Sequence, residues 1–480
     1  MEFYESGLTF FRALEGVRKG LTRFAGPSRV ALLFARSKSD QLRVCDYYGL
    51  LNDHKPAIKK LFVDNPSWRD NAEDTSKWPP FNYAQVFVNP GLHDLIALGQ
   101  RSKSLFYQLW MTELHPGLCN PGPIERWLQQ AAWLLSHDLS VGPAGTYSEA
   151  SKNALEGYAP QAVLHHINST LNNFLKRETK MQASLIVDSI LGISTSVEEG
   201  KMPEGTICFL ERDQLDQVSF AARFTDEDAP QLRSHKHVGK ALAAVADSGY
   251  FLIGDCKLIH GIGQGALPDY ALIAKFRRKH GDLSLGSKKV CAFSQGRLLA
   301  YAQYPVLHEL DSAFSLVGIA PEEQGIVRNV LKFIVDEAVK EKHGCTIVLD
   351  CGDNIAVSGQ SLATPIDLRV QQNLSLACQM SRADGALVIR NQVYLSAFAC
   401  ILHGSRSLGE DLSRGARFNS AVRFVENNKK TMIIVVSEDG MATVLANGLR
   451  ATPIIDYVPP TWATGNAPTL DAWLKEAPRA

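Results

Sequence analysis

The stretch SRADGALVIR, residues 381–390, decides how the C-terminal part of the chain is interpreted. The apolar run after its glycine predicts a buried strand. Asp384 and Gly385 stand directly before that strand, so the carboxylate is expected at the end of a sheet, where open α/β sheets commonly bind ligands. Gly385 has no side chain and permits a ligand to approach the backbone closely. The alternative, in which Asp384 is only a turn residue after the preceding helix, stays open at this point.

The segments around this stretch alternate between helix and strand patterns. Residues 326–344 have apolar side chains at helical spacing and stop at a glycine, and residues 345–351, CTIVLDC, predict a buried strand. Further elements are expected in this order: a helix over 366–380, two strands over 384–400, a helix over 415–428 and a hairpin over 431–446. This order indicates a mixed sheet with helices packed on it.

A second polar cluster lies in SRGARFNSAVRF, residues 413–424. Arg414 and Arg417 flank Gly415 at the start of the expected helix, where free N–H groups attract anions and arginine binds phosphate in a bidentate manner. Alternatively, these arginines only form a solvated basic start of the helix. Arg423 lies on nearly the opposite helical face from Arg417 and is left out of the site.

Glu438 follows the strand MIIVV and its neighbour Ser437. A carboxylate at this strand end, together with Asp384, could share a divalent metal. Taken alone, Glu438 is more typical of a polar residue in a hairpin.

The whole chain indicates a globular protein of several domains. Its 480 residues are 45% hydrophobic and 21% charged. Lys+Arg and Asp+Glu both number 50, so we expect neither direct DNA binding nor attraction to an anionic membrane. The nine cysteines form no CxxC pair, which favours free thiols in a reducing compartment. With no signal peptide and no apolar run near the ~20 residues of a membrane span, we expect a cytoplasmic protein.

Upstream of residue 321 we expect two α/β regions, residues 1–150 and residues 151–320. A helix over 122–139 is followed by a turn-rich break at 140–151, and strand patterns continue to FSLVGIA at 314–320. Residues 451–480 are expected to form a tail with a short amphipathic helix. One aromatic set either packs in a core, the more common case, or lines a ligand pocket: Phe106, Tyr107, Trp110, Trp127 and Trp133.

The segments DGALVI, GARFNSA and VVSEDG, in this order, resemble the diadenylate cyclase (DAC) domain, the catalytic module of the DNA-integrity scanning protein family. The resemblance covers roughly residues 326–447. It implies an α/β fold class: a mixed-sheet DAC-like domain at 321–450, with helices on the sheet, preceded by the two α/β regions. It also implies Mg²⁺ or Mn²⁺ as cofactor and a homo-oligomer, because two such domains face each other to join two ATP molecules into cyclic di-AMP with release of pyrophosphate.

The resemblance implies a role for individual residues. Asp384 and Glu438 match catalytic and metal-binding carboxylates, Gly385 and Ala386 match the glycine and alanine that shape the nucleotide pocket, and Arg417 matches a phosphate-binding arginine. The nucleotide-binding set is completed by residues of the same motif: Arg414, Gly415, Asn419 and Ser420.

This chain also departs from the family pattern. Ala383 stands where the family has a histidine before DGA, and Ala416, Phe418 and Asn419 replace a threonine, a histidine and a second arginine. Each lost contact to a developing anion costs ~2–4 kcal/mol of transition-state stabilisation. Three hypotheses follow: an ATP-binding diadenylate cyclase controlled by the upstream sensor-like regions, a catalytically silent nucleotide or cyclic-dinucleotide sensor that signals through a partner, and a scaffold that binds no nucleotide.

Overall fold

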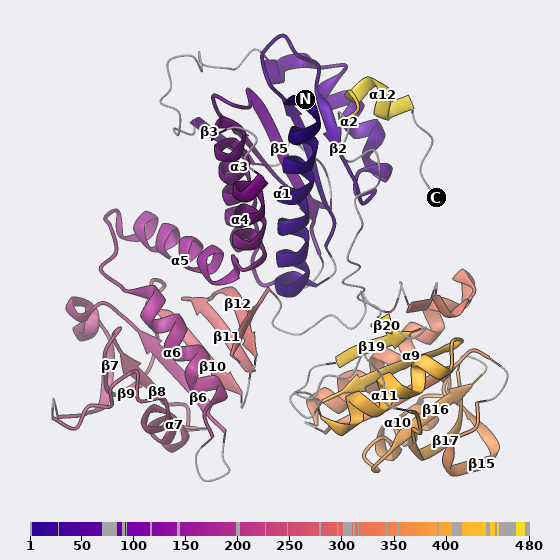
Figure 1. Ribbon diagram of the computed structural model, residues 1–480. Helices are drawn as coiled ribbons and strands as arrows, with labels where there is room; N and C mark the ends of the chain where they lie inside the picture. The colour runs from indigo at the N-terminus through magenta and orange to yellow at the C-terminus, as the bar shows by residue number, and fades with distance from the viewer. Residues whose placement is uncertain are drawn as a thin grey trace. The chain divides into compact units, whose positions relative to one another are not determined.

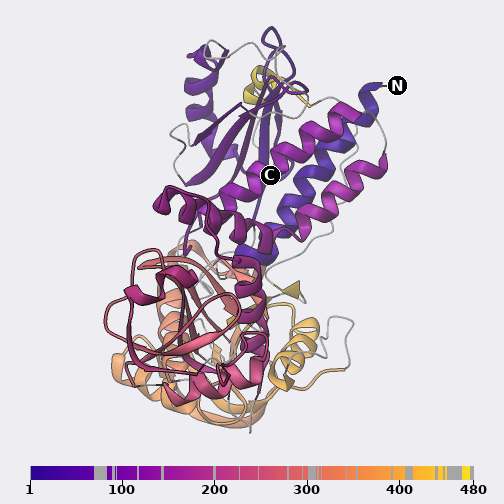
Figure 2. The same ribbon diagram turned by 90° about the vertical axis from the view of Figure 1, so that its left-hand side faces the viewer.

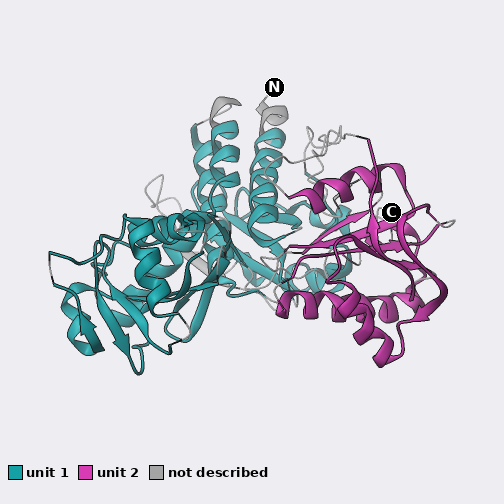
Figure 3. Ribbon diagram, turned by 90° about the horizontal axis from the view of Figure 1, so that it is seen from below, with its two compact units in different colours: residues 1–302, 454–480 teal, residues 303–453 magenta. Residues whose placement is uncertain are grey.

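The computed structural model divides the chain into two compact units (Figures 1 and 3). Unit 1 contains residues 1–302 and 454–480, and unit 2 contains residues 303–453. The structure describes residues 2–26, 28–69, 84–88, 92, 94–115, 118–141, 145–197, 202–225, 227–246, 248–277, 280–294, 296–300, 310, 313–314, 316–341, 343–352, 355–390, 393–405, 415–437, 442–446, 449–450 and 467–475.

Unit 1 begins with a five-stranded antiparallel sheet. Its strand order is β2 (Arg43–Cys45), β1 (Val30–Ala35), β5 (Tyr107–Glu113), β4 (Leu95–Arg101) and β3 (Ala84–Val88). Three helices lie side by side on one face (Figure 2): α1 (Glu2–Ala25), α3 (Gly122–Val141) and α4 (Gly145–Glu156). Every residue of β1 is buried, because Leu32 packs toward these helices while Leu33 packs on the other face with α2 (Lys55–Phe62).

Helices α1 and α4 approach each other backbone to backbone. A Cβ atom on Gly16 would lie 2.7 Å from the carbonyl oxygen of Lys152, and one on Gly20 would lie 2.5 Å from that of Leu155. Helix α4 occupies part of the segment 140–151 that was predicted as a turn-rich break, so that prediction is wrong from Gly145 onward. The two glycines allow close packing, which here outweighs the weak local helix preference of the segment.

Helix α5 (Ala159–Leu175) packs on α3 in the first part of unit 1. The second part is an eight-stranded sheet with helices α6 (Ala183–Thr195) and α7 (His235–Ala244). The strand order is β13 (Arg297–Leu299), β12 (Lys288–Ser294), β11 (His280–Leu285), β10 (Leu272–Arg277), β6 (Glu204–Phe209), β8 (Phe251–Gly254), β9 (Ile259–Gln264) and β7 (Ser219–Arg223). Helix α6 buries Ile186 and Ile190 in the same core as the sheet.

The C-terminal segment returns to the first sheet of unit 1. The N–H of Val44 in β2 donates to the carbonyl of Pro468 at 3.0 Å, and the N–H of Leu470 donates to the carbonyl of Leu42 at 2.7 Å. Helix α12 (Leu470–Lys475) then buries Leu470 and Trp473 against the face of the sheet that α2 also covers. The expected amphipathic helix of the tail is therefore part of the N-terminal core.

Unit 2 is a mixed sheet between two helical layers. Its strand order is β15 (Ser358–Asp367), β17 (Tyr394–Ile401), β16 (Ala386–Arg390), β14 (Cys345–Asp350), β18 (Thr431–Val436), β19 (Ala442–Ala446) and β20 (Leu449–Arg450). Helices α9 (Pro321–Lys340) and α10 (Gln371–Met380) share one core with the sheet, and α11 (Ala416–Asn427) shares the other. The expected fold class, a mixed C-terminal sheet with helices preceded by two α/β regions, is confirmed.

At the margins of unit 2, one prediction is wrong and one strand was not predicted. The segment FSLVGIA was expected to be a strand, but Phe314 and Val317 lie in helical residues and are both buried, as the three-residue spacing of one helix face allows. Strand β15 was not expected at all. This strand is polar and mostly exposed, and it pairs with β17 through the backbone. Hydrophobic periodicity therefore does not reveal it.

Candidate functional site

The candidate site lies at one edge of the sheet of unit 2, where the central strands begin or end. Strands β14 and β16 are parallel, with Thr346 beside Ala386, whereas β18 is antiparallel to β14, with Val436 beside Cys345. The residues before β14, before β16 and after β18 therefore meet at the same edge. Asp384 stands at the end of the sheet, as expected, but at the amino ends of the parallel strands, opposite to the end where open α/β sheets usually bind ligands.

Asp384 presents its carboxylate to solvent at this edge. The side chain is 99% exposed, and its Oδ1 atom accepts a hydrogen bond from the N–H of Gly385 at 3.1 Å. Such a carboxylate is hydrated and directly accessible to a cation or a hydroxyl group. Among the described residues, Asp384 accepts no hydrogen bond that caps a helix, and its only turn hydrogen bond is the one from Gly385.

Gly385 is required by the sheet itself. Its φ is +111°, and a Cβ atom would lie 2.5 Å from the carbonyl carbon of Ala399 in β17. Only glycine combines this backbone conformation with such a close neighbour. Ala386 is buried between the sheet and the α11 layer. The DGA sequence thus sets the backbone of the strand entrance and leaves Asp384 as its only solvent-facing functional group.

Arg417 on α11 faces Asp384. The Nη2 atom of Arg417 lies 3.7 Å from Oδ1 of Asp384, and the arginine side chain is 39% exposed. Its other terminal nitrogen lies over Gly344, where a Cβ atom would come within 2.6 Å of Nη1. An exposed ion pair at this distance contributes little stability, ~0–1 kcal/mol. The pair therefore adds little to folding and leaves both charged groups accessible at the surface.

The rest of the arginine motif is divided between the site and the core. Gly415 has extended backbone at the start of α11, and the hydroxyl of Ser420 donates to the carbonyl of Arg417 at 3.0 Å. Phe418 is 3% exposed and belongs to the core between α11 and the sheet. Asn419 stands half-buried in the same turn. The position at which the family pattern has a histidine is therefore directed into the hydrophobic layer in this chain.

His343 is a residue of this edge that the sequence analysis did not select. Its Nε2 atom lies 2.9 Å from the hydroxyl of Ser381, whose proton is donated to the carbonyl of Cys378 at 2.7 Å. This arrangement suits a proton on Nε2 that is donated to the serine oxygen, while Nδ1 lies 3.9 Å from Oε2 of Glu341. Burial lowers the pKa of His343, and the positive charges of Arg382 and Arg417 lower it further, against the opposing effect of Glu341. The sequence marked this position only as the end of a helix.

Two predicted site residues, Glu438 and Arg414, lie outside the described residues, as does the predicted hairpin turn at Asp439 and Gly440. Within the described ranges, no three His, Cys, Asp or Glu side chains gather at metal-binding distance. Mg²⁺ is commonly held by one or two carboxylates together with substrate phosphates. An exposed Asp384 fits that mode of binding.

Three family models match this chain. Residues 334–449 match the DAC model, described as the nucleotide-binding domain of the DisA bacterial checkpoint controller. Unit 2 carries a DAC domain. The resemblance found in the sequence is thereby confirmed, and members of this domain family use a divalent metal. Residues 5–177 match the probable sensor domain DACND, and residues 184–291 match the probable sensor domain DACNH, so two probable sensor domains precede the DAC domain.

Solved structures give more distant likenesses. A hypothetical membrane spanning protein from Bacillus cereus is 22% identical, with 25% of this chain and 60% of that chain covered and a TM-score of 0.22. A double mutant of DacA from Staphylococcus aureus is 24% identical, with 27% of this chain and 86% of that chain covered and a TM-score of 0.21. The chain thus spans about three fifths of the length of the Bacillus protein. No curated protein matches the chain.

Among the described residues, no helix is both long and apolar enough to cross a bilayer.

Proposed function

We propose that the DAC domain binds ATP at the edge formed by Asp384 and Arg417, and that two copies of the chain join two ATP molecules into cyclic di-AMP. The observation that carries this proposal is the exposed carboxylate opposite a half-exposed guanidinium, with the first turn of α11 beside them. Arginine and the N–H groups of a helix start are the usual protein partners of phosphate.

The reaction is a transfer of a nucleotidyl group. The 3′-oxygen of one ATP forms a bond to the α-phosphorus of the other, the bond from that phosphorus to the pyrophosphate oxygen breaks, and pyrophosphate leaves. The same exchange in the opposite direction closes the ring. Arg417 holds the phosphates, and Asp384 accepts the hydrogen bond of the attacking hydroxyl, whose proton passes to solvent at this exposed edge.

A divalent ion fits beside Asp384, and Glu438 is the second carboxylate that the family resemblance assigns to it. When bound, such an ion neutralises phosphate charge during transfer. The two probable sensor domains would then control the reaction from unit 1.

The alternative function is a nucleotide sensor without catalysis. A specific observation favours it: Phe418 is buried in the core at a position where the family pattern has a histidine, and Ala383 replaces another histidine. Both changes remove groups that would otherwise contact phosphate or metal. Binding by Arg417 and Asp384 would persist while turnover is lost.

One experiment separates the two functions. The purified full chain is incubated with ATP and either Mn²⁺ or Mg²⁺, and cyclic di-AMP is measured by mass spectrometry. Cyclic di-AMP that disappears in Asp384→Asn supports the enzyme. Absence of product together with ATP binding that Arg417→Ala weakens supports the sensor, and absence of both contradicts the proposal.

Arg423→Ala serves as the matched control, because it removes an arginine from the same helix. The Cβ atom of Arg423 packs at Gly404, and alanine keeps this atom. We expect Arg423→Ala to bind ATP as the natural chain does. Equal loss of binding in both variants would indicate that a change in α11, rather than a missing phosphate contact, is responsible.

A further inference from the structure

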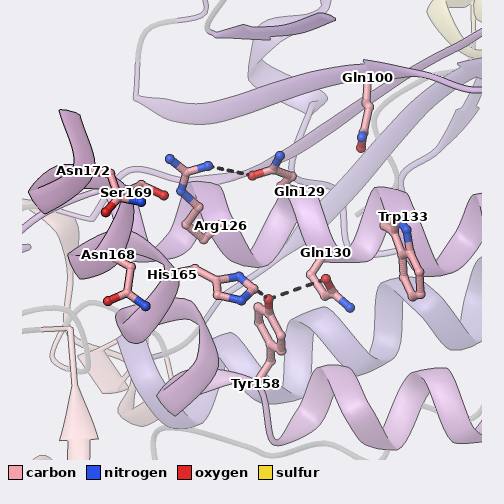
Figure 4. A pocket seen from close by; sticks show the side chains of 10 residues that line it. All are labelled: Gln100, Arg126, Gln129, Gln130, Trp133, Tyr158, His165, Asn168, Ser169 and Asn172. Atoms are coloured by element: carbon pink, nitrogen blue, oxygen red, sulfur yellow. Dashed lines mark hydrogen bonds between the residues drawn. The ribbon is translucent and has the colours of Figure 1, made fainter. Parts of the chain in front are cut away.

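The DACND part of unit 1 contains a cavity that is separate from the DAC domain. It has a volume of about 390 Å³ and lies between strand β4, helix α3 and helix α5 (Figure 4). This volume falls in the range of ~300–1,000 Å³ typical of small-molecule sites. The lining residues are Gln100, Arg126, Gln129, Gln130, Trp133, Tyr158, His165, Asn168, Ser169 and Asn172.

The lining has an unusual chemistry for a gap between packed elements. Five of the ten side chains are carboxamides, one is a guanidinium, and none of these described residues is acidic. Of the aromatic set identified in the sequence, only Trp133 lines this cavity, whereas Trp110 and Trp127 are fully buried in the core. The cavity is thus a polar site with one fixed positive charge.

Two carboxamide oxygens in this cavity have no hydrogen-bond partner in the described structure. They are Oε1 of Gln100, a residue only 1% exposed, and Oδ1 of Asn168. A buried acceptor without a donor costs ~1–3 kcal/mol, so such groups are rarely left unpaired unless a ligand or water pairs with them. Both oxygens are shielded from solvent in this structure, and a molecule with N–H or O–H donors would satisfy them once the two side chains turn toward the cavity.

The remaining polar groups are held in place by one another. Nη1 of Arg126 donates to Oε1 of Gln129 at 2.9 Å, and this bond uses one of the five N–H donors of the guanidinium. The hydroxyl of Tyr158 lies 3.0 Å from Nδ1 of His165 and donates to Oε1 of Gln130 at 3.5 Å. Burial raises the pKa of Tyr158 to about 12, so its hydroxyl keeps its proton at neutral pH.

We propose that this cavity is the ligand site of the N-terminal domain and that it binds a nucleoside monophosphate. Arg126 would bind the phosphate, because guanidinium forms paired hydrogen bonds with that group. Carboxamides carry a donor and an acceptor side by side and match the edges of nucleobases. One face of Trp133 stacks on His137, with ring centroids 5.6 Å apart, and its other face would stack on the base. The site is independent of the nucleotide site proposed for the DAC domain.

The test uses the full chain with Arg417→Ala in the background, so that nucleotide binding by the DAC domain is removed. Isothermal titration with AMP, GMP, CMP and UMP, and with ribose 5-phosphate and inorganic phosphate, is expected to show binding by at least one nucleotide. Arg126→Gln should weaken that binding by roughly 10- to 100-fold. Arg23→Gln is the matched control, because Arg23 is exposed, lies in the same domain and is not part of the cavity lining.

Asn168→Ala provides a second variant that distinguishes a binding role from a structural one. Because the oxygen of Asn168 is unpaired, its removal should leave the melting temperature unchanged or higher, while it weakens the nucleotide by roughly 2- to 10-fold. A lower melting temperature with unchanged affinity would assign Asn168 to the fold and contradict the proposal.

Three further results would overturn the inference. These are binding of no nucleotide, binding that survives Arg126→Gln, and binding that appears only when Arg417 is restored. Equal affinity for ribose 5-phosphate and the nucleotides would contradict the assignment of the carboxamides to a nucleobase.

Discussion

Replacement of Gly385 by alanine should destabilise unit 2 strongly while it leaves unit 1 intact. The residue has a φ of +111°, a conformation that costs an L-residue ~1–3 kcal/mol. The new Cβ atom would lie 2.5 Å from the carbonyl carbon of Ala399 and 2.8 Å from the nitrogen of Cys400, both of which are backbone atoms of a paired strand. Overpacking of this kind adds ~1–3 kcal/mol, so the total is ~2–6 kcal/mol.

The assay must report on unit 2 alone. All seven tryptophans lie outside residues 303–453, so tryptophan fluorescence follows unit 1. Amide hydrogen exchange measured by mass spectrometry follows individual strands instead. We expect the free energy of opening to fall by ~2–6 kcal/mol in β14 and β16, and to stay unchanged in β1 and β5.

Gly325→Ala is the matched control for this prediction. Gly325 lies inside α9 with no atom within 4 Å of the position of a Cβ, so alanine should stabilise the helix by ~0.5–1 kcal/mol. Exchange in β14 that is the same in Gly385→Ala as in the natural chain would refute the reasoning. It would mean that β17 can move away from the strand entrance.

Four more predictions concern other parts of the chain. Trp473→Ala should lower the free energy of unfolding of unit 1 by ~3–5 kcal/mol in urea titrations followed by fluorescence, because the ring fills the core between α12 and the first sheet; an unchanged midpoint would contradict this packing. Burial alone would raise the pKa of Asp255, but the nearby His260, with Nε2 3.1 Å from Oδ2, and hydrogen bonds from two backbone N–H groups lower it to about 2. Its stabilisation of ~2 kcal/mol should therefore be present above pH ~4 and lost as the pH falls toward 2. Asp255→Asn should abolish this acid dependence, and an unaltered profile would count against it. His343→Gln keeps a donor for Ser381 and should retain ATP binding measured by titration, whereas His343→Ala should weaken that binding. Equal loss of ATP binding in both variants would assign the effect to Nδ1 instead. If two DAC domains must meet, the rate of cyclic di-AMP formation should rise with the square of protein concentration at low concentration, and a linear rise would argue against a dimeric site.

The sequence predicted the centre of unit 2 well because its central strands are buried on both faces. The apolar runs of β14, β16 and β18 leave little choice of structure, because every one of their residues but Arg390 is buried. Strand β15 escaped prediction because edge pairing depends on backbone hydrogen bonds, which any residues except proline can make.

The candidate site was predicted in part, and the missing part has a physical reason. Asp384 and Arg417 were selected separately from the sequence, and the packing of α11 on the sheet over β16 brings them within 3.7 Å. His343 was missed because its importance comes from Ser381, 38 residues away, and no local pattern records that contact. The cavity of unit 1 was missed for the same reason, since β4, α3 and α5 each supply only a few polar residues.

The return of the C-terminal segment has a consequence for the order in which the protein is made. The sheet edge at β2 and the apolar surface around Phe62 are synthesised early, yet their partners Pro468 and Trp473 come about 400 residues later. At ~5–20 residues per second, the ribosome needs roughly 20–80 s to cover that distance. The domain that contains β2 is therefore completed only after the DAC domain has been synthesised. During that interval an open strand edge and an uncovered hydrophobic face are the natural binding place for a chaperone.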